Sequence, residues 1–179
     1  MKHQIMARKS FTTLLVTGTP GTGKTVLAKK LSLLLNYTYF DVNSFIKNAH
    51  IYSSYDQKRR SYVVDEAKLA REMVKVRGNA LESGQKGIVF DSHLSHYLPS
   101  KYANLCLVTR CRLKTLQKRL HDKGYPTAKV RENMEAEIFE VCLSDARELG
   151  HRIMEFDTSS AKKSDVESLA RKLSKSVRT

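Results

Sequence analysis

Cysteine, proline and tryptophan are scarce in this sequence, with three, three and none among its 179 residues. Cys106, Cys111 and Cys142 are odd in number and lack Cys-x-x-Cys spacing, which argues against a disulfide framework and against a zinc site. No apolar run approaches the roughly 20 residues that span a bilayer. Residues 1–10 contain basic side chains but not the apolar stretch of a signal peptide. These absences predict a cytoplasmic protein without a membrane partner, which in a eukaryotic source could also enter the nucleus.

Acidic residues are also few, with 18 against 32 lysines and arginines and a formal net charge of +14. The chain is 41% hydrophobic and long enough to bury a core, so we expect one globular domain over residues 1–179. The excess positive charge is larger than one bound nucleotide requires. It favours a polyanionic partner such as RNA, and a basic surface that is simply solvated explains it equally well.

A glycine-rich stretch, Gly18-Thr19-Pro20-Gly21-Thr22-Gly23-Lys24-Thr25, matches the phosphate-loop pattern G-x-x-x-x-G-K-[ST] at every fixed position. Residues 12–17 before it predict a buried strand, and residues 26–35 after it predict a helix. In such a loop Lys24 reaches the β- and γ-phosphates of ATP and the Thr25 hydroxyl ligates Mg²⁺. The predicted nucleotide-binding residues here are Gly18, Pro20, Gly21, Thr22, Gly23, Lys24, Thr25 and Val26.

Alternating strands and helices follow this loop. The predicted strands are 37–41, 87–93, 104–109 and 152–157, and the predicted helices are 42–49, 65–82, 112–123, 127–149 and 164–176. Residues 51–62 are polar and aromatic without a clean period, which suggests a mobile segment that covers the substrate. The order predicts an α/β fold of the P-loop NTPase type, a doubly wound, five-stranded parallel sheet with helices on both faces.

Asp91 ends the apolar run Gly87-Ile88-Val89-Phe90, as the Walker B carboxylate does, and we expect it to orient Mg²⁺. Residues two apart on a strand face the same side, so His93 is expected beside Asp91. His93 could position a water molecule or accept a proton, or it could serve only as a structural residue of the loop. His96 has no comparable argument and is expected to be structural.

Phosphoryl transfer requires cations around the moving group. The candidates in the second half of the chain are Arg110, Arg119, Lys123, Lys129 and Arg131. Only a few residues separate the helices predicted to end at Lys123 and to begin near Thr127, too few for a hairpin lid. Because a lid keeps water from the reacting phosphate, a minimal one predicts some ATP hydrolysis alongside transfer.

Three stretches, GTPGTGKT, the DSH that follows an apolar strand, and KGYPTAKVRENMEAEIFEV, resemble the adenylate kinase isoenzyme 6 family. The likeness runs from Leu14 to about Val166. It implies a nucleoside monophosphate kinase-like fold that transfers the γ-phosphoryl group of Mg-ATP to AMP and also hydrolyses ATP. Residues of about 41–64 would bind the monophosphate, and residues of about 121–131 would form a short lid. It further implies a role in maturation of the small ribosomal subunit, with a platform protein and pre-ribosomal RNA as partners, and a monomer or a transient hetero-complex.

The resemblance also implies roles for individual residues. Lys24, Asp91, His93 and Lys123 would be catalytic; Asp91 and Thr25 would hold the metal; and Gly21, Gly23, Lys24, Thr25, Lys123 and Lys162 would contact the nucleotide. The chain departs from the family at Val26, where a second threonine is usual, and at Lys123, where arginine is usual; lysine lacks the bidentate guanidinium. The family also has a nucleotide-contacting lysine late in the chain, and Lys162 is its nearest counterpart here.

Two other functions remain open. The fold could act as an ATP-gated module in ribosome assembly, with hydrolysis driving release. It could also be a kinase for another small metabolite such as shikimate, since Asp41-Val42-Asn43 loosely matches the acidic substrate-binding position of such enzymes. The DSH and Glu-Asn-x-Glu motifs argue against the second.

Overall fold

The computed structural model describes residues 11–57 and 61–176. Its centre is a five-stranded sheet in the order β2 (Thr38–Asp41), β5 (Gly87–Asp91), β1 (Thr12–Thr17), β6 (Leu105–Arg110) and β7 (Ile153–Asp157). All neighbouring strands pair in parallel. The central strand β1 is buried at every position, in agreement with the buried strand predicted over residues 12–17. The predicted parallel sheet is therefore confirmed.

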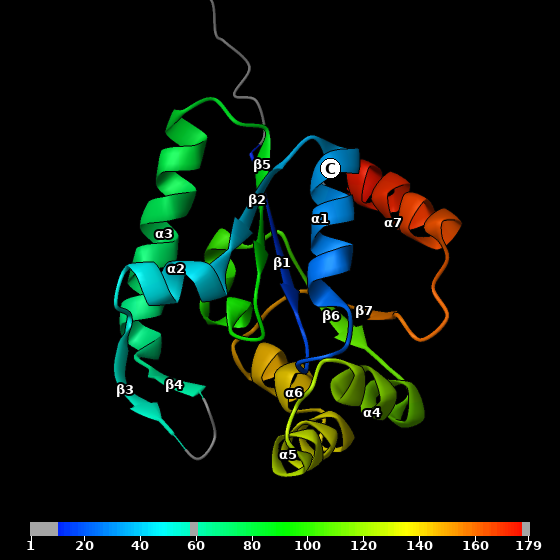
Figure 1. Ribbon diagram of the computed structural model, residues 1–179. Coiled ribbons are helices and arrows are strands. Elements are labelled where there is room, and N and C mark those ends of the chain that lie inside the picture. The colour runs from blue at the N-terminus through cyan, green and yellow to red at the C-terminus, as the bar shows by residue number, and fades with distance from the viewer. Residues whose placement is uncertain (1–10, 58–60, 177–179) are drawn as a thin grey trace, which may run out of the picture.

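Helices cover both faces of this sheet (Figure 1). On one face, α1 (Lys24–Leu35) and α7 (Lys163–Ser176) lie against a core that includes Leu14, Val16 and Leu107. On the other face, α3 (Glu66–Glu82) and α6 (Val141–Glu148) bury Leu15, Phe90 and Met73. Alternate residues of β1 thus point into opposite cores, which is the period of a strand covered on both sides.

Residues 51–62, expected to be an irregular segment, instead contribute to a hairpin. After α2 (Val42–Asn48), β3 (Tyr52–Asp56) pairs antiparallel with β4 (Ser61–Val64). The ring of Tyr62 lies 4.4 Å from that of Tyr52 and 5.0 Å from that of Tyr55, centroid to centroid. These cross-strand rings stabilise a pair whose polar sequence has no clear alternation. Residues 58–60 lie outside the described part of the chain.

The helix predicted over residues 127–149 is also different, because it is broken into α5 (Thr127–Ile138) and α6. Glu140 between them has a left-handed backbone with φ 54°. No glycine or proline marks this break in the sequence. The Glu140 carboxylate accepts a hydrogen bond from Arg110 Nη1 at 2.8 Å, which helps to hold the junction against the end of β6.

The strand predicted over residues 87–93 ends earlier, at Asp91. The chain then bends into two 3₁₀ turns, Ser95–Tyr97 and Ser100–Tyr102, before β6. His93 therefore does not share a strand with Asp91, and the alternation argument for its direction was wrong. The remaining helix, α4 (Leu113–Asp122), is as expected. Among the described helices, none combines the length and the apolar character needed to cross a bilayer.

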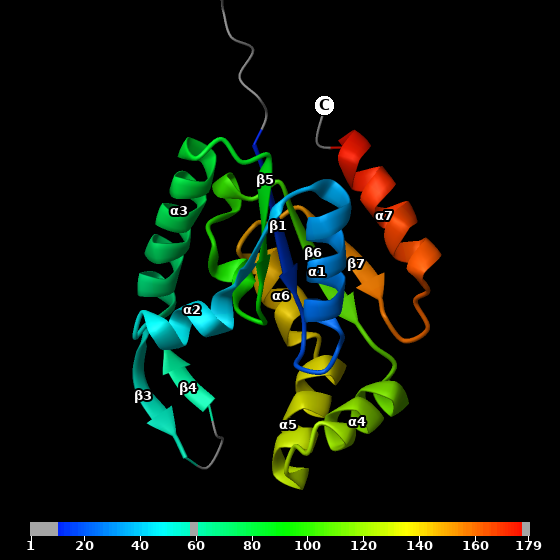
Figure 2. The same ribbon diagram turned by 45° about the horizontal axis from the view of Figure 1, so that its top comes forward.

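Two small substructures flank the end of the sheet at which β1 runs into the glycine-rich loop. Figures 1 and 2 show the β3–β4 hairpin on one side and the α4–α5 pair on the other. Ligands of open parallel sheets bind at this end, outside the carboxyl ends of the strands. The fold therefore places its candidate site between the 41–64 segment and the α4–α5 pair.

Candidate nucleotide site

The loop between β1 and α1 requires its glycines. Gly18, Gly21 and Gly23 have φ values of 134°, 94° and 91°, which side chains rarely tolerate. A methyl group on Gly18 would lie 2.5 Å from the carbonyl oxygen of Thr109. A methyl group on Gly21 would lie 2.8 Å from a methyl carbon of Leu116. The loop is thus packed against β6 and α4 as well as curled.

Threonine hydroxyls from neighbouring strands hold this backbone in place. Thr109 Oγ1 donates to the carbonyl of Thr17 at 3.1 Å and lies 2.6 Å from Thr22 Oγ1. Thr158, just after β7, donates to the carbonyl of Thr22. Neither Thr109 nor Thr158 was identified from the sequence, and no motif or spacing there could have identified them. They hold the loop through contacts within the protein, as in preorganised phosphate sites.

Lys24 is buried at the first turn of α1, with 8% of its surface exposed. Its ammonium group donates to the carbonyl of Thr19 at 3.0 Å. Burial lowers the pKa of Lys24 to about 8, although nearby Cys142 and Asp91 act in the opposite direction. The amine is therefore mostly charged at neutral pH, and it rests on an acceptor that a phosphate oxygen could replace.

Asp91 lies beside Val16 in the sheet register and is 2% exposed. Its Oδ2 accepts a hydrogen bond from the Tyr39 hydroxyl at 2.9 Å. Its Oδ1 is buried and has no hydrogen-bond partner among the described residues. A buried carboxylate oxygen without a partner is costly unless a ligand completes it. Mg²⁺ fits this oxygen, because hard cations prefer carboxylate and phosphate ligands.

The protein offers few further ligands for such a cation. Within residues 11–57 and 61–176, no three His, Cys, Asp or Glu side chains gather as a metal site. This pattern suits a Mg²⁺ ion that is held by one carboxylate, by the predicted Thr25 hydroxyl and mainly by the phosphates of its nucleotide. Thr25 is exposed at the loop, where a nucleotide phosphate would lie.

His93 is half-buried next to this carboxylate's strand. Burial is the main reason that its pKa falls to about 3, and Lys24, His96 and Lys129 lower it further. The imidazole is therefore neutral at physiological pH, able to exchange hydrogen bonds but a weak base. His96 is 1% exposed, and its Nδ1 lies 2.9 Å from Thr17 Oγ1 below the loop, in keeping with the structural role expected of it.

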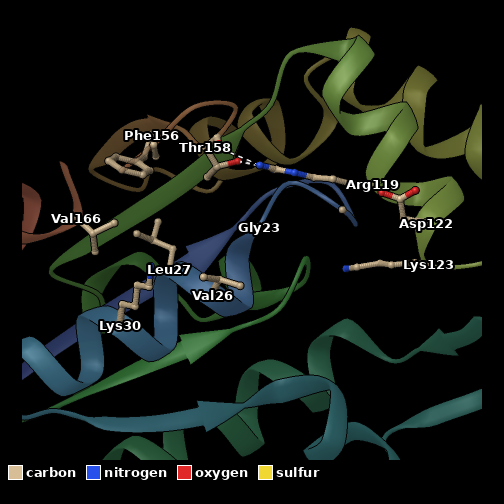
Figure 3. Close-up of a pocket in the computed structure, with 12 residues that line it drawn as sticks. Gly23, Val26, Leu27, Lys30, Arg119, Asp122, Lys123, Phe156, Thr158 and Val166 are labelled. Atoms are coloured by element: carbon tan, nitrogen blue, oxygen red, sulfur yellow. Dashed lines mark hydrogen bonds between the residues drawn. The ribbon is translucent and has the colours of Figure 1, made fainter. Parts of the chain in front are cut away.

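A pocket of about 430 Å³ opens beside the loop (Figure 3). One wall is apolar, with Leu27, Phe156 and Val166, and the opposite rim carries Arg119 and Lys123. A flat aromatic base fits a pocket with this composition. The remaining lining residues are Gly21, Gly23, Val26, Lys30, Asp122, Thr158 and Ala161. The predicted contact Lys162 is absent from this lining; its neighbour Ala161 takes that place.

Arg119 is tied to the same structure that holds the loop. Its guanidinium donates to Thr158 Oγ1 at 2.9 Å and to the Thr158 carbonyl at 2.8 Å (Figure 3). Arg119 is one of the cation candidates that the sequence suggested for phosphoryl transfer. The structure places it at the rim of the pocket, where a planar guanidinium could stack on a base.

Three of the other four cation candidates lie outside the pocket lining. Arg110 contacts three carboxylates, at 3.1 Å for Glu137, 2.8 Å for Glu140 and 3.1 Å for Glu155. Lys129 and Arg131 pair with Glu132 and Glu135 along α5. Lys123 alone follows Arg119 into the lining, because it sits at the C-terminal end of α4 where residues 123–126 connect to α5.

Comparisons with known proteins agree with this geometry. The sequence profile of the AAA domain family AAA_18 matches residues 14–140. The chain is 32% identical over 163 residues to a putative adenylate kinase of Methanocaldococcus jannaschii, covering 91% of this chain and 84% of the relative. It is 33% identical over 135 residues to an adenylate kinase isoenzyme 6 homolog of Caenorhabditis elegans, covering 75% and 72%.

A solved structure supports the fold alone. The shikimate kinase of Acinetobacter baumannii superposes with a TM-score of 0.51 at 15% identity, covering 93% of each chain. By sequence the relatives named above are much closer. Together with the phosphate loop, the pocket beside it and the Asp91 oxygen that has no partner among the described residues, they show that this chain is a P-loop kinase-type protein of the adenylate kinase isoenzyme 6 family.

Proposed function

We propose that the protein transfers the γ-phosphoryl group of Mg-ATP to AMP. The observation that carries this proposal is the juxtaposition of Lys24 and the partnerless Oδ1 of Asp91 with the pocket beside the loop. The pocket would take the adenine of ATP, and the loop amides would take its phosphates. Relatives named as adenylate kinases support AMP as the acceptor.

The residues at the loop would stabilise the reacting phosphates rather than form covalent bonds. Lys24 would leave the Thr19 carbonyl and bind the β- and γ-phosphates, Lys123 would approach the phosphates from the rim, and Arg119 would stack on the base. Asp91 and Thr25 would hold Mg²⁺, which neutralises phosphate charge when it is bound. An oxygen of the AMP phosphate attacks the γ-phosphorus, the bond to the bridging oxygen breaks, and two ADP molecules result.

The weak basicity of His93 suits this acceptor. An AMP phosphate is already ionised at neutral pH, since its second pKa is about 6, so its oxygen needs no base to attack. A hydroxyl acceptor, such as that of a sugar or shikimate, must lose a proton. With a pKa of about 3, His93 would contribute little as a base, and we propose that it positions the phosphate or a water molecule through hydrogen bonds.

The acceptor would bind on the side of α2 and the β3–β4 hairpin, within about residues 41–64. This segment flanks the strand ends opposite the α4–α5 pair (Figure 2). The metabolite-kinase alternative assigned a substrate contact to Asp41. Both oxygens of Asp41 instead cap α2, accepting from Ser44 N at 3.0 Å and from Ser44 Oγ at 2.9 Å. This capping role weighs against Asp41 as the site of a shikimate-like acceptor.

We extend the proposal to ATP hydrolysis and to maturation of the small ribosomal subunit. The connection over residues 123–126 is short for a lid, so water should reach the γ-phosphate in part of the turnovers. A basic chain of +14 suits a partner surface rich in RNA phosphate. A small-subunit platform protein bound near pre-ribosomal RNA is the partner that the family relationship suggests, reached by a monomer or in a transient complex.

Product analysis by chromatography tests the reaction. The protein is incubated with Mg-ATP alone and then with AMP, CMP, UMP or shikimate added singly. We expect AMP to disappear and two ADP molecules to form for each ATP consumed. Equal rates of ADP and free phosphate in every tube would contradict transfer and favour an ATP-gated assembly module. In that case, stimulation of hydrolysis by small ribosomal subunits becomes the deciding measurement.

A further inference from the structure

A buried carboxylate remains outside the mechanism described above. Glu137 lies near the C-terminal end of α5 and is only 5% exposed. Its Oε2 accepts a hydrogen bond from Thr19 Oγ1 in the phosphate loop at 2.6 Å. Its Oε1 accepts from Arg110 Nε and from the Cys111 backbone N–H, both at 3.1 Å. One side chain of the α4–α5 pair thus binds the loop and the end of β6 together.

The chemistry of these contacts requires a carboxylate. Three donors converge on two oxygens, and an ionised carboxylate can accept all of them. A glutamine of the same shape would accept at one position only and would present amide N–H groups at the other, either to the donors of Arg110 and Cys111 or to Thr19, whose hydroxyl would then have to accept. Glu137→Gln therefore loses the charge-assisted hydrogen bond that Thr19 donates to the carboxylate.

Thr19 is the residue on which the catalytic lysine rests. Its carbonyl accepts from Lys24 Nζ at 3.0 Å, from Thr22 Oγ1 at 2.7 Å and from the Thr22 backbone N–H at 3.1 Å. The position of this peptide therefore sets both the curl of the loop and the starting point of the Lys24 ammonium. Glu137 binds the side-chain hydroxyl of this same threonine.

The α4–α5 pair is joined to the loop by a second, apolar contact. Leu116 and Leu120 of α4 pack with Val130 of α5 in a small cluster of their own. Carbon atoms of both leucines would lie within 3 Å of a methyl group on Gly21. The helix pair that carries Arg119 and Lys123 thus contacts the loop through leucine side chains at Gly21 and through a carboxylate at Thr19.

We propose that Glu137 is a positioning residue that couples the α4–α5 pair to the phosphate loop, so that this helix pair determines the position of the Lys24 ammonium group. The kinetic part of this proposal rests on the phosphotransfer proposed above. Loss of the contact would misdirect Lys24 mainly when charge develops on the transferred phosphoryl group. It would therefore lower kcat more than it raises the KM for ATP.

The kinetic test uses variants at both ends of the contact. Thr19→Val removes the hydroxyl at nearly constant shape, Thr19→Ser keeps it, and Glu135→Gln is the matched control on an exposed face of α5. We expect Glu137→Gln and Thr19→Val each to lower kcat about tenfold or more, as for a lost hydrogen bond to a charged group. The KM for ATP should change less than about threefold. Glu135→Gln should retain wild-type kcat, and Thr19→Ser, which keeps the hydroxyl, should lose much less than Thr19→Val.

The double variant separates coupling from general damage. Because both substitutions remove the same contact, Glu137→Gln combined with Thr19→Val should be no slower than the slower single variant. Multiplying losses in the double variant, or an equal loss in Thr19→Ser, would overturn the proposal. If Glu137→Gln fails to fold, the comparison of Thr19→Val with Thr19→Ser still decides whether the hydroxyl contact matters.

Amide hydrogen exchange provides a test that needs no acceptor. In the free protein, the peptide covering residues 18–25 should exchange faster in Glu137→Gln and in Thr19→Val than in wild type, and at the wild-type rate in Glu135→Gln. Unchanged exchange in the first two variants would refute the coupling. If AMP proves not to be the acceptor, the proposed reaction fails, but this exchange measurement still decides the role of Glu137.

Discussion

Replacing Lys24, the proposed catalytic lysine, should make the protein inactive and more stable. Lys24 has an ordinary pKa of 10.5 that burial lowers to about 8 in the folded protein. At about 1.4 kcal/mol for each pKa unit, the folded state bears a cost of about 3 kcal/mol for keeping this charge. Lys24→Met removes the charge but keeps the length and most of the volume of the side chain. The substitution also removes one hydrogen bond, worth about 1 kcal/mol.

The acceptor of that hydrogen bond is not left unpaired in Lys24→Met. The Thr19 carbonyl keeps two donors, Thr22 Oγ1 at 2.7 Å and the Thr22 backbone N–H at 3.1 Å. The net expectation is a gain of about 2 kcal/mol at pH 7, which for a chain of this size raises Tm by about 4–8 °C. Phosphoryl transfer and ATP hydrolysis should both be lost in Lys24→Met. A gain in stability together with a loss of activity is the trade-off expected when a functional residue destabilises the fold.

The pH dependence gives a second measure of the same cost. Between pH 8 and pH 10.5 the folded wild type has released the Lys24 proton while the unfolded chain still holds it. The contribution of Lys24 to the free energy of unfolding therefore rises with pH across that window. Because Lys24→Met lacks the group, its advantage should shrink as the pH is raised from about 8 to about 10.5.

Urea or thermal unfolding of both proteins at several pH values measures this, with Lys172→Met as the control for an exposed helical lysine. The control should differ from wild type by no more than about 0.5 kcal/mol. A Lys24→Met protein that unfolds more readily than wild type at pH 7 would show that the burial of Lys24 is not costly, and the argument would fail.

Three further predictions concern the loop and the strand ends. Asp91→Asn should raise the Mg²⁺ concentration needed for half-maximal turnover at least tenfold, measured by Mg²⁺ titration, because it removes the charge of the partnerless Oδ1; an unchanged Mg²⁺ requirement would contradict it. Gly21→Ala should destabilise the protein by about 1–3 kcal/mol in urea unfolding, from its φ of 94° and its contact with Leu116; wild-type stability would count against the geometry. The pKa of His93 is about 3, so its imidazole titrates below pH 5. The pH profile of kcat between pH 5 and 7.5 should therefore have the same shape in wild type and in His93→Asn.

Features encoded in short stretches were predicted well. The phosphate loop, the buried strand over residues 12–17 and the Asp91 strand end each depend on a few neighbouring residues, and the parallel sheet follows from their order. The β3–β4 hairpin was missed because cross-strand packing of Tyr52 and Tyr62, rather than alternation, stabilises it. The break at Glu140 was missed because the left-handed residue there is neither glycine nor asparagine.

The contacts that hold the loop could not have been predicted from spacing. Thr109, Glu137 and Thr158 reach it from 87, 118 and 136 residues away in the chain. Arg110 shows the same limit for a residue that the sequence did suggest as a phosphate contact. It follows a strand, as a phosphate-binding arginine can, but the carboxylates that engage it come from α5, from the α5–α6 junction and from β7. Side-chain partners of this kind depend on tertiary packing, which local patterns do not contain.

These contacts also make one side of the candidate site more rigid than the other. The side proposed to bind ATP is tied by Thr109, Thr158 and Glu137 to three separate elements. The side proposed to bind the acceptor includes the β3–β4 hairpin, which forms its own two-stranded sheet and pairs with no strand of the main sheet among the described residues. Tyr52 and Val64 pack against the core where the hairpin begins and ends, but a two-stranded hairpin is by itself only marginally stable. The side proposed to bind ATP should therefore be rigid before ATP binds, and the hairpin should become more protected as the acceptor binds.

Hydrogen exchange of the free protein tests this difference. Amides of residues 52–56 and 61–64 should exchange orders of magnitude faster than those of the buried strand β1, because local opening of the hairpin leaves the main sheet intact. Adding AMP together with a non-hydrolysable ATP analogue should slow exchange in the hairpin far more than in residues 18–25. Hairpin amides as protected as those of β1 in the free protein would show that the acceptor side is preformed, and acceptor binding would then need no ordering step.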